Sequence, residues 1–298
     1  MGKIEAVVVN HNTSLYTELL LRSFYDKHAV PLDVSMTVLD NNSEDDMSML
    51  ESYASQKSIA IVKTRWNTRT ETNTHGEVLR EFVLTHPNCE HYLFLDADAC
   101  FCEENTVHAM MDELEKNEDV FGVQARMSWD GVNPVPEDAY WKTVKTYMKF
   151  KFGVGKEPDG DVSTYGLNIA AVGDRCHPFC CLIRNSEVFR MVVEKIGLSA
   201  YRSFAETDGK GFDTFGMMTQ VMNTHKLRHI VSSKMVIHFC GVSYNPKHYS
   251  GDDNSALKTM QKKRCLELLE RLRGSPGEKV QRISLFSPPP PSPSCSMN

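Results

Sequence analysis

The sequence predicts an α/β fold in which a mostly parallel β-sheet is covered by helices on both faces. In residues 1–128, short apolar runs alternate with helical patterns of about 10–15 residues, which is the spacing of crossover connections between parallel strands. Two of the apolar runs end in carboxylates, "VLDNNSEDD" at 38–46 and "HYLFLDADAC" at 91–100. Ligands of such sheets bind beyond the carboxyl ends of the strands, so we expect the functional site along that edge of the sheet.

Each element of the first 128 residues follows from its apolar pattern. The expected strands are apolar runs bounded by polar turns: Ile4–Val9, Val34–Leu39, Ile59–Lys63, Tyr92–Leu95 and Val120–Met127. The expected helices carry apolar residues at intervals of three and four, as Leu15, Leu19 and Leu20 do in the first of them: Ser14–Lys27, Asp46–Ser55, His75–Leu84 and Asn105–Lys116. We therefore expect residues 1–128 to form one α/β half.

Residues 129–272 are less regular and are expected to form a second half. A helix is expected in "EDAYWKTVKTYMKFKF", and a strand in "PFCCLIR" at 178–184. Further expected elements are the helices Ser186–Lys195, Asp213–Asn223 and Ala256–Leu272 and the strand Arg228–His238. Residues 273–298 include "SPPPPSPS", a composition that cannot bury a core, so a disordered tail is expected there.

Composition narrows the class of protein. The 298 residues are 41% hydrophobic, which is enough for a substantial core. A net charge of −6 without a long Lys/Arg block argues against nucleic acid as a partner. Nine cysteines without a secretory signal favour reduced thiols, and no apolar run reaches the ~18 residues of a membrane span. We expect a cytoplasmic protein that contacts membranes at most peripherally.

The carboxylates at the strand ends are candidate metal and nucleotide ligands. Asp96 and Asp98 can aim oxygens at one hard divalent cation, and Mg²⁺ and Mn²⁺ prefer such ligands. Asp40 ends another strand and is followed by Asn-Asn-Ser, while Asn10-His11-Asn12 follows the first strand. A solvated acidic loop and an ordinary polar turn are the alternative interpretations of these two stretches.

Three motifs resemble the sugar-nucleotide half of family 2 glycosyltransferases, which have a GT-A, Rossmann-like fold. They are "VVVNHNTSLYTELLLRSF", "VLDNNSEDD" and "YLFLDADACF"; looser matches in "CCLIRNSEVF", "FDTFGMMTQVM" and "MVIHFCGVSY" extend the resemblance over roughly residues 4–245. The resemblance implies a Mn²⁺- or Mg²⁺-dependent transfer of a hexosyl or deoxyhexosyl group from a nucleotide diphosphate sugar to a hydroxyl acceptor. That acceptor would be a glycan, a lipid-linked molecule or a small molecule. Residues 1–128 would bind the nucleotide sugar, and residues 129–272, with the C-terminal helix, would bind the acceptor.

The resemblance also implies roles for individual residues. Asp40 would contact the nucleotide base, Asp96 would lie toward the ribose and the metal, and Asp98 would bind the metal. Asn10 and Asn12, which follow the first strand, and Asn42, which follows Asp40, complete the expected nucleotide site. His238 matches a position where relatives place a histidine near the metal or diphosphate; a histidine satisfied at its strand end is the alternative.

An inverting transfer needs a general base to deprotonate the acceptor hydroxyl, and Asp213 is the first candidate. The family's Glu-Asp pair is here Phe212-Asp213, and its Asn-x-Gly motif is "NTHG", one residue out of register. Glu206 and Asp208 are rival bases, and capping of the following helix is an alternative role for Asp213. Other open functions are a non-catalytic sugar-nucleotide or glycan-binding protein and a sugar-nucleotide-forming nucleotidyltransferase.

Two further groups of residues have ordinary explanations. Zinc binding by Cys176, His177, Cys180 and Cys181, or by Cys100 and Cys102, matches no structural zinc spacing, so buried free thiols are favoured. The lysines of the expected helix in 137–152 are favoured to form a solvated face, with contact to an anionic acceptor or lipid as the alternative: Lys142, Lys145 and Lys149.

Overall fold

A computed structural model of the chain describes residues 2–64, 74–132, 134, 175–199, 214–239, 242 and 253–274. Its centre is one eight-stranded sheet. In spatial order the strands are β3 (Ala60–Lys63), β2 (Val34–Asp40), β1 (Ile4–Asn10), β4 (His91–Asp96), β7 (Cys180–Arg184), β6 (Val120–Ser128), β8 (Arg228–His238) and β5 (Ala99–Phe101). Only β7 and β5 run against the others, so the expectation of a mostly parallel sheet is confirmed.

Helices cover both faces of the sheet, as the α/β prediction requires. One apolar cluster joins the sheet to α1 (Ser14–Lys27), α2 (Ser48–Gln56) and α4 (Thr106–Glu115). A second joins the other face to α3 (Thr74–Thr85), α7 (Glu187–Lys195) and α8 (Gly216–Thr224). Alternation along β1 sends Ala6 and Val8 into the first cluster and Val7 into the second, since successive strand residues point to opposite faces.

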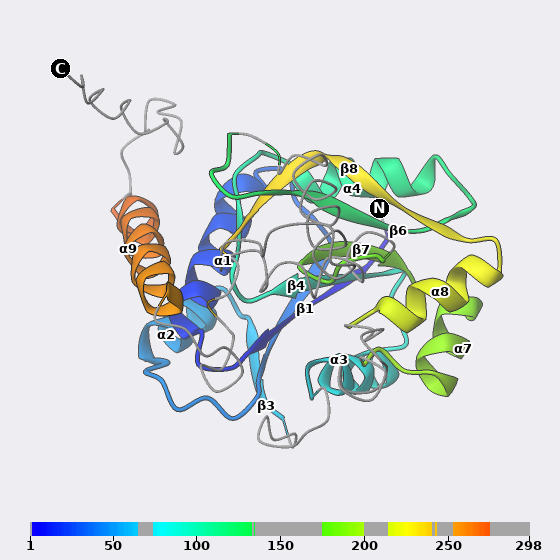
Figure 1. Cartoon of the computed structure of the whole chain (residues 1–298), viewed down its shortest axis with the longest axis horizontal. Helices are drawn as coiled ribbons and strands as arrows, with labels where there is room; N and C mark the ends of the chain where they lie inside the picture. The colour runs from blue at the N-terminus through cyan, green and yellow to red at the C-terminus, as the bar shows by residue number, and fades with distance from the viewer. Residues whose placement is uncertain are drawn as a thin grey trace, which may run out of the picture.

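The last described helix, α9 (Asp253–Arg273), lies outside these two layers. Figure 1 shows α9 at the outer side of α1 and α2, on the opposite side of the molecule from α7 and α8. It packs on α1 and on the end of β8 through a third apolar cluster that includes Tyr16, Phe239 and Leu269. The C-terminal helix is therefore part of the folded body.

Several element ends differ from the prediction by one to three residues, as α9 does, and three differences have a local reason. β5 was not expected, because three residues after an Asp-x-Asp turn carry too little pattern to indicate a strand. α2 begins at Ser48 and not at Asp46, whose carboxylate accepts a hydrogen bond from the Ser48 N–H at 2.9 Å just outside the helix. α8 begins at Gly216 after Phe215, which has φ 70° and so precedes the helical backbone. The expected helix in 137–152 and the expected tail beyond residue 274 lie outside the described residues.

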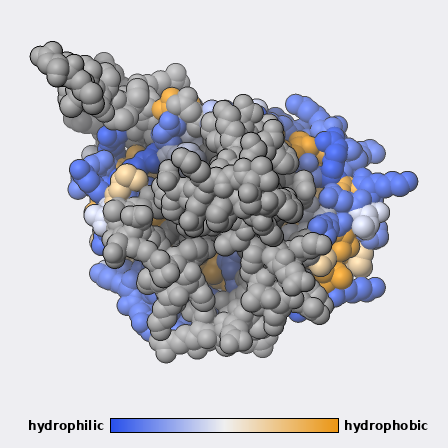
Figure 2. Space-filling view, in the orientation of Figure 1, coloured by the Kyte–Doolittle hydropathy of each residue, from blue (hydrophilic) through white to orange (hydrophobic). Residues whose placement is uncertain are grey.

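On the face seen in Figure 2, the described surface is mostly hydrophilic. Figure 2 shows charged and polar groups at the periphery of the molecule, interrupted by small separate hydrophobic groups. Among the helices that the structure describes, none is both long and apolar enough to cross a membrane.

Candidate metal and nucleotide site

Three of the predicted site residues share one edge of the sheet. In the parallel register Asn10 lies opposite Asp40, and Val9 lies opposite Asp96, so β1, β2 and β4 end side by side. Each strand then passes into a polar turn at the carboxyl edge, where ligands of open α/β sheets bind. The predicted common edge is confirmed.

Asp96, Asp98 and His238 form a cluster at this edge. The chain turns after Asp96 and enters β5, which pairs with β8 so that Ala99 lies opposite His238. His238 Nε2 thereby lies 3.1 Å from Asp98 Oδ1 and 3.5 Å from Asp96 Oδ2. One ligand atom from each of the three residues lies within 4.8 Å of the other two. The short strand β5 is therefore what brings His238 to the Asp-x-Asp turn.

Backbone hydrogen bonds hold this cluster on both sides. The Asp96 N–H donates to the Phe179 carbonyl at 2.9 Å, and the Phe239 N–H donates to the Asp98 carbonyl at 3.0 Å. Only 19% of the Asp96 side chain and 5% of the Asp98 side chain are exposed. The two carboxylates are thus positioned by neighbouring strands and are largely buried.

Two histidines that sequence reasoning did not assign to the site lie close to Asp96. His75 Nε2, at the start of α3, lies 3.9 Å from Asp96 Oδ1, and the His177 ring centroid lies 6.1 Å from that of His238. Burial by itself raises the pKa of Asp96, but the hydrogen bond from His238 and the charge of His75 outweigh it, so the pKa falls below its usual range. Burial also lowers the pKa of His177 well below 6.5, which keeps that ring neutral.

In the motif "NTHG", Gly76 directly follows His75 at the start of α3. Gly76 packs so tightly that a Cβ there would lie 2.3 Å from Ser199 Cα. A larger residue at position 76 would force the backbone at Ser199 or at the start of α3 to shift. The Glu77 carboxylate accepts a hydrogen bond from the Ser199 hydroxyl and fixes the same contact. The glycine next to His75 is therefore explained by close packing.

Asp40 lies in the turn that was predicted to receive the nucleotide base. Its Oδ1 accepts a hydrogen bond from the Ser43 N–H at 3.2 Å, and 4% of the residue is exposed. Asn42 is exposed with φ 62°, a left-handed conformation that asparagine tolerates. Asn12 is also exposed, and its Oδ1 accepts from the Glu44 N–H at 2.7 Å. The loops after β1 and β2 are thus joined to each other.

Asn10 lies beneath these loops and is completely buried. Its Nδ2 donates to Ser14 Oγ at 3.2 Å and to Ser43 Oγ at 2.9 Å. Its Oδ1 accepts from Thr13 Oγ1 at 3.1 Å and from Thr17 Oγ1 at 2.9 Å. These four bonds use both N–H groups and both lone pairs of the oxygen, which is the full capacity of the amide. Asn10 therefore supports the loops from below.

The remaining site predictions cannot all be placed. Asp213, Glu206 and Asp208, the candidate bases, and Lys142, Lys145 and Lys149, the expected basic face, lie outside the described residues. The zinc alternative receives no geometric support, since the one group with metal-binding geometry in the described ranges is Asp96, Asp98 and His238. Cys100, Cys176, Cys180 and Cys181 are buried free thiols, as favoured from their spacing.

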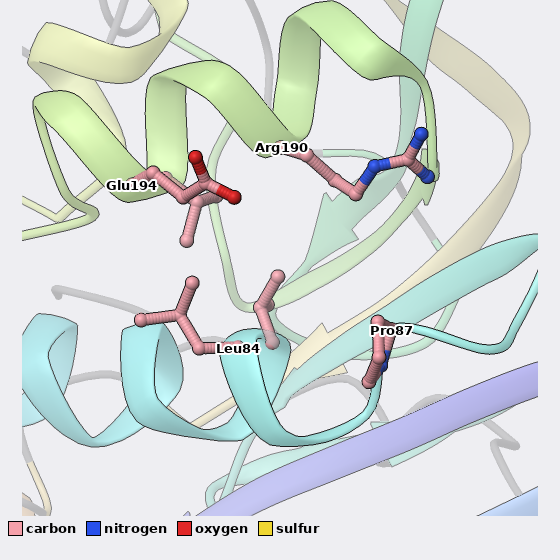
Figure 3. A pocket seen from close by; sticks show the side chains of 6 residues that line it. Leu84, Pro87, Arg190 and Glu194 are labelled. Carbon is pink, nitrogen blue, oxygen red and sulfur yellow. The ribbon is translucent and has the colours of Figure 1, made fainter.

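A shallow pocket elsewhere on the molecule is distinct from this edge. Figure 3 shows Arg190 and Glu194 of α7 facing Leu84 and Pro87 from the end of α3, with Val83 and Val193 completing the lining. Pro87 precedes the first residue of β4, whereas Asp96 is the last residue of that strand. The pocket therefore lies toward the amino end of β4, away from the acidic cluster.

Comparison with known proteins identifies the fold. No protein-family model matches the chain, and a search of curated proteins found no match. Among solved structures, the mannosyltransferase PcManGT from Pyrobaculum calidifontis, in complex with GDP-Man and Mn²⁺, has a TM-score of 0.51 at 13% identity, over 92% of this chain and 74% of that one. Glucosyl-3-phosphoglycerate synthase from Mycobacterium tuberculosis, with Mn²⁺, UDP and glucosyl-3-phosphoglycerate, has a TM-score of 0.46 at 13% identity, over 93% and 82%. The likeness to the first shows a shared fold.

Proposed function

Because the chain has the GT-A fold, we propose that it is a metal-dependent glycosyltransferase of the family 2 type. It would move a sugar from a nucleotide diphosphate sugar to a hydroxyl acceptor. The observation that carries this proposal is the cluster of Asp96, Asp98 and His238 beside the Asp40 turn at the carboxyl edge of the sheet. PcManGT, with the same fold, was crystallised with a nucleotide diphosphate sugar and Mn²⁺, which supports the donor class.

The residues of the cluster fit a divalent cation such as Mn²⁺ or Mg²⁺. Two carboxylates and one imidazole, each with a ligand atom within 4.8 Å of the others, are donors that these cations accept. When bound, such a cation stabilises the negative charge that the diphosphate gains as the glycosidic bond breaks. Asp96, Asp98 and His238 would hold it. His75 would lie close to the same site, because its Nε2 is near Oδ1 of Asp96 whereas His238 is near Oδ2.

The Asp40 turn would bind the nucleotide. The turn is polar and lies beside the cluster, and Asn12 and Asn42 are the exposed amides next to it. Asn10 would act only through the loops that it supports, because its amide has no capacity left for a ligand. Free cysteines in the described ranges suit a reducing compartment, which supports a cytoplasmic location.

An inverting mechanism with Asp213 as general base is the finer part of the proposal. Thr214, the next residue in the sequence, has its Oγ1 3.3 Å from His75 Nδ1, and His75 lies 3.9 Å from Asp96. The chain next to Asp213 therefore passes close to the acidic cluster, which supports a base from this segment. Glu206 and Asp208 remain the rival bases.

The activity is tested by incubating the full chain with Mn²⁺ and a panel of UDP- and GDP-sugars, with and without simple hydroxyl acceptors. We expect release of UDP or GDP from one donor, and its loss on addition of chelator. NMR of the transferred sugar should show an inverted anomeric configuration. A donor that binds but is never hydrolysed or transferred would favour the non-catalytic binding protein, and formation of a sugar nucleotide from a sugar phosphate would favour the nucleotidyltransferase.

The general base is tested by three substitutions that remove a carboxylate at nearly constant size. Asp213→Asn should reduce transfer by about 10²-fold or more while donor affinity stays near wild type, because a base acts in the transition state. Glu206→Gln and Asp208→Asn are the matched controls. Wild-type transfer rates in all three variants would exclude the inverting-base mechanism.

A further inference from the structure

Phe239 connects the acidic cluster to the C-terminal helix. It follows His238 directly and is completely buried. Its N–H donates to the Asp98 carbonyl at 3.0 Å, and its own carbonyl accepts from Gln261 Nε2 of α9 at 2.6 Å. One residue thus makes a backbone hydrogen bond to the Asp-x-Asp turn and accepts a hydrogen bond from α9.

The ring of Phe239 is held from two further sides. Tyr16 of α1 meets it edge-on with the ring centroids 5.4 Å apart, and the Arg264 guanidinium carbon of α9 lies 5.5 Å from its centroid. Leu268 and Leu269 of α9 belong to the same apolar cluster. Movement of α9 would therefore move the residue that follows His238.

The far end of α9 is anchored by a buried ion pair. Arg273 donates from Nε to Glu18 Oε1 at 3.0 Å and from Nη2 to Glu18 Oε2 at 2.5 Å. Only 1% of the Glu18 side chain is exposed, and Arg22 Nε also donates to its Oε1 at 2.7 Å. The buried Glu18 carboxylate therefore holds two guanidinium groups, Arg22 within α1 and Arg273 at the end of α9. The helix is thus fixed to α1 at one end and to Phe239 nearer its beginning.

We propose that α9 is a positioning element for the metal cluster, acting through Phe239, with Gln261 as the positioning residue. The inference rests on the proposed metal-dependent function. Metal affinity depends on groups that hold the ligands in place as well as on the ligands. His238 is the terminal residue of β8, so its placement against Asp98 depends on how the chain is held at Phe239.

The test uses Gln261→Met, which keeps the side-chain length and removes the amide that bonds to Phe239. Two measurements are made on the full chain: hydrogen exchange of the Phe239 amide without metal, and Mn²⁺ affinity from the EPR signal of free Mn²⁺. We expect exchange to accelerate at least tenfold and the Kd for Mn²⁺ to rise about tenfold, the lower end of the range for groups that orient metal ligands.

Asn185→Leu is the matched control. The Asn185 amide also donates to backbone carbonyls, to Cys89 at 2.7 Å and Pro87 at 2.9 Å, but it does so at the amino end of β4. Asn185→Leu should lower the melting temperature about as much as Gln261→Met does. It should leave both the exchange of the Phe239 amide and the Kd for Mn²⁺ unchanged. An equal loss of Mn²⁺ affinity in the control would assign the effect to general destabilisation and overturn the proposal.

Glu18→Gln provides a second variant at the far end of α9, in case Gln261→Met folds poorly. It should raise the Kd for Mn²⁺ in the same direction by about two- to threefold, a smaller effect because the anchor acts at greater distance. Folded variants with wild-type exchange and wild-type Kd would refute the role of α9. If the wild-type chain binds no Mn²⁺, the proposed function fails, while Phe239 exchange still decides whether α9 holds this segment.

Discussion

Asp40 and Asn10 lie opposite each other at the ends of β2 and β1, yet their side chains have different surroundings. The Asp40 carboxylate accepts a hydrogen bond from the Ser43 N–H, whereas the Asn10 amide has four hydroxyl partners and is completely buried. A carboxylate retains acceptor capacity after one hydrogen bond, and a fully bonded amide does not. At the residue scale we therefore expect substitution of Asp40 to affect nucleotide affinity and substitution of Asn10 to affect the free energy of unfolding.

Asp40→Ala should weaken nucleotide binding and leave Mn²⁺ affinity unchanged. Loss of a hydrogen bond from the nucleotide base to the Asp40 carboxylate is expected to cost about 1–3 kcal/mol of binding free energy. Calorimetric titration with UDP and GDP, at constant Mn²⁺, measures the change. Equal nucleotide affinity in wild type and variant would show that Asp40 only shapes its turn.

Asn10→Ala should instead lower the free energy of unfolding. Four hydroxyl groups lose their common partner in a buried site, and we expect a loss of about 2–3 kcal/mol in urea unfolding. Asn12→Gly is the control: Asn12 is exposed with φ 55°, which glycine adopts readily, so the loss should stay under about 1 kcal/mol. Similar losses in both variants would contradict the central role of Asn10.

At the scale of elements, His28 joins the end of α1 to the start of α4. Its Nδ1 lies 2.7 Å from the Phe24 carbonyl, to which it donates, and its Nε2 accepts from the Val107 N–H at 3.1 Å. The N-cap residue of α4, Asn105, makes no side-chain capping bond, so His28 supplies an acceptor that this helix end would otherwise lack. Both ring nitrogens are used only while the imidazole is neutral.

This arrangement predicts a pH dependence of stability. Burial lowers the pKa of His28 from 6.5 to about 4, and the charge of the neighbouring His108 acts in the same direction. Between these values the unfolded chain binds a proton that the folded chain does not, so stability is full above pH 6.5 and is lost as the pH falls toward 4. The contribution is about 3 kcal/mol, since each pKa unit corresponds to about 1.4 kcal/mol.

The measurement compares urea unfolding of wild type and His28→Gln at pH 7.5 and pH 4.5. We expect the wild type to be more stable at pH 7.5, and the difference between the two proteins to shrink at pH 4.5. The comparison between variants removes the contribution of other groups that titrate in this range. A difference that stays constant or grows on acidification would contradict the neutral role of His28.

At the scale of the whole molecule, ligand binding and folding are linked. A ligand that binds only the folded chain adds about 2.7 kcal/mol to the free energy of unfolding at 100 times its Kd, which for a domain of this size corresponds to about 5–10 °C in melting temperature. We expect UDP or GDP to stabilise the chain more in the presence of Mn²⁺ than with chelator.

Asp98→Ala should abolish this dependence on Mn²⁺ while the protein stays folded, because the variant removes a carboxylate 3.1 Å from His238 Nε2. Asp119→Ala is the control, since Asp119 is an exposed acid paired with Arg228 at the far end of β8. Retention of the Mn²⁺-dependent shift in Asp98→Ala would remove Asp98 from the metal site.

The sequence by itself determined most elements and the edge on which the site lies. The bounds Ser14–Lys27 were predicted as the structure has them, because an amphipathic period records which side of a helix is buried. A strand was predicted near Arg228–His238, where β8 lies. Asp40 and Asp96 were placed at one edge from their positions at strand ends, since parallel strands separated by crossover helices all end on the same side.

The tertiary structure alone decided which distant residues meet at that edge. A periodic pattern shows that a face is buried and does not identify its partner. The pairing of β5 with β8 brings His238 to Asp98, α3 brings His75 to Asp96, and α9 brings Gln261 to Phe239. Each contact joins segments far apart in the sequence through pairing or packing that no local pattern encodes. The sequence therefore indicated the acidic edge, and long-range packing assembled the cluster there.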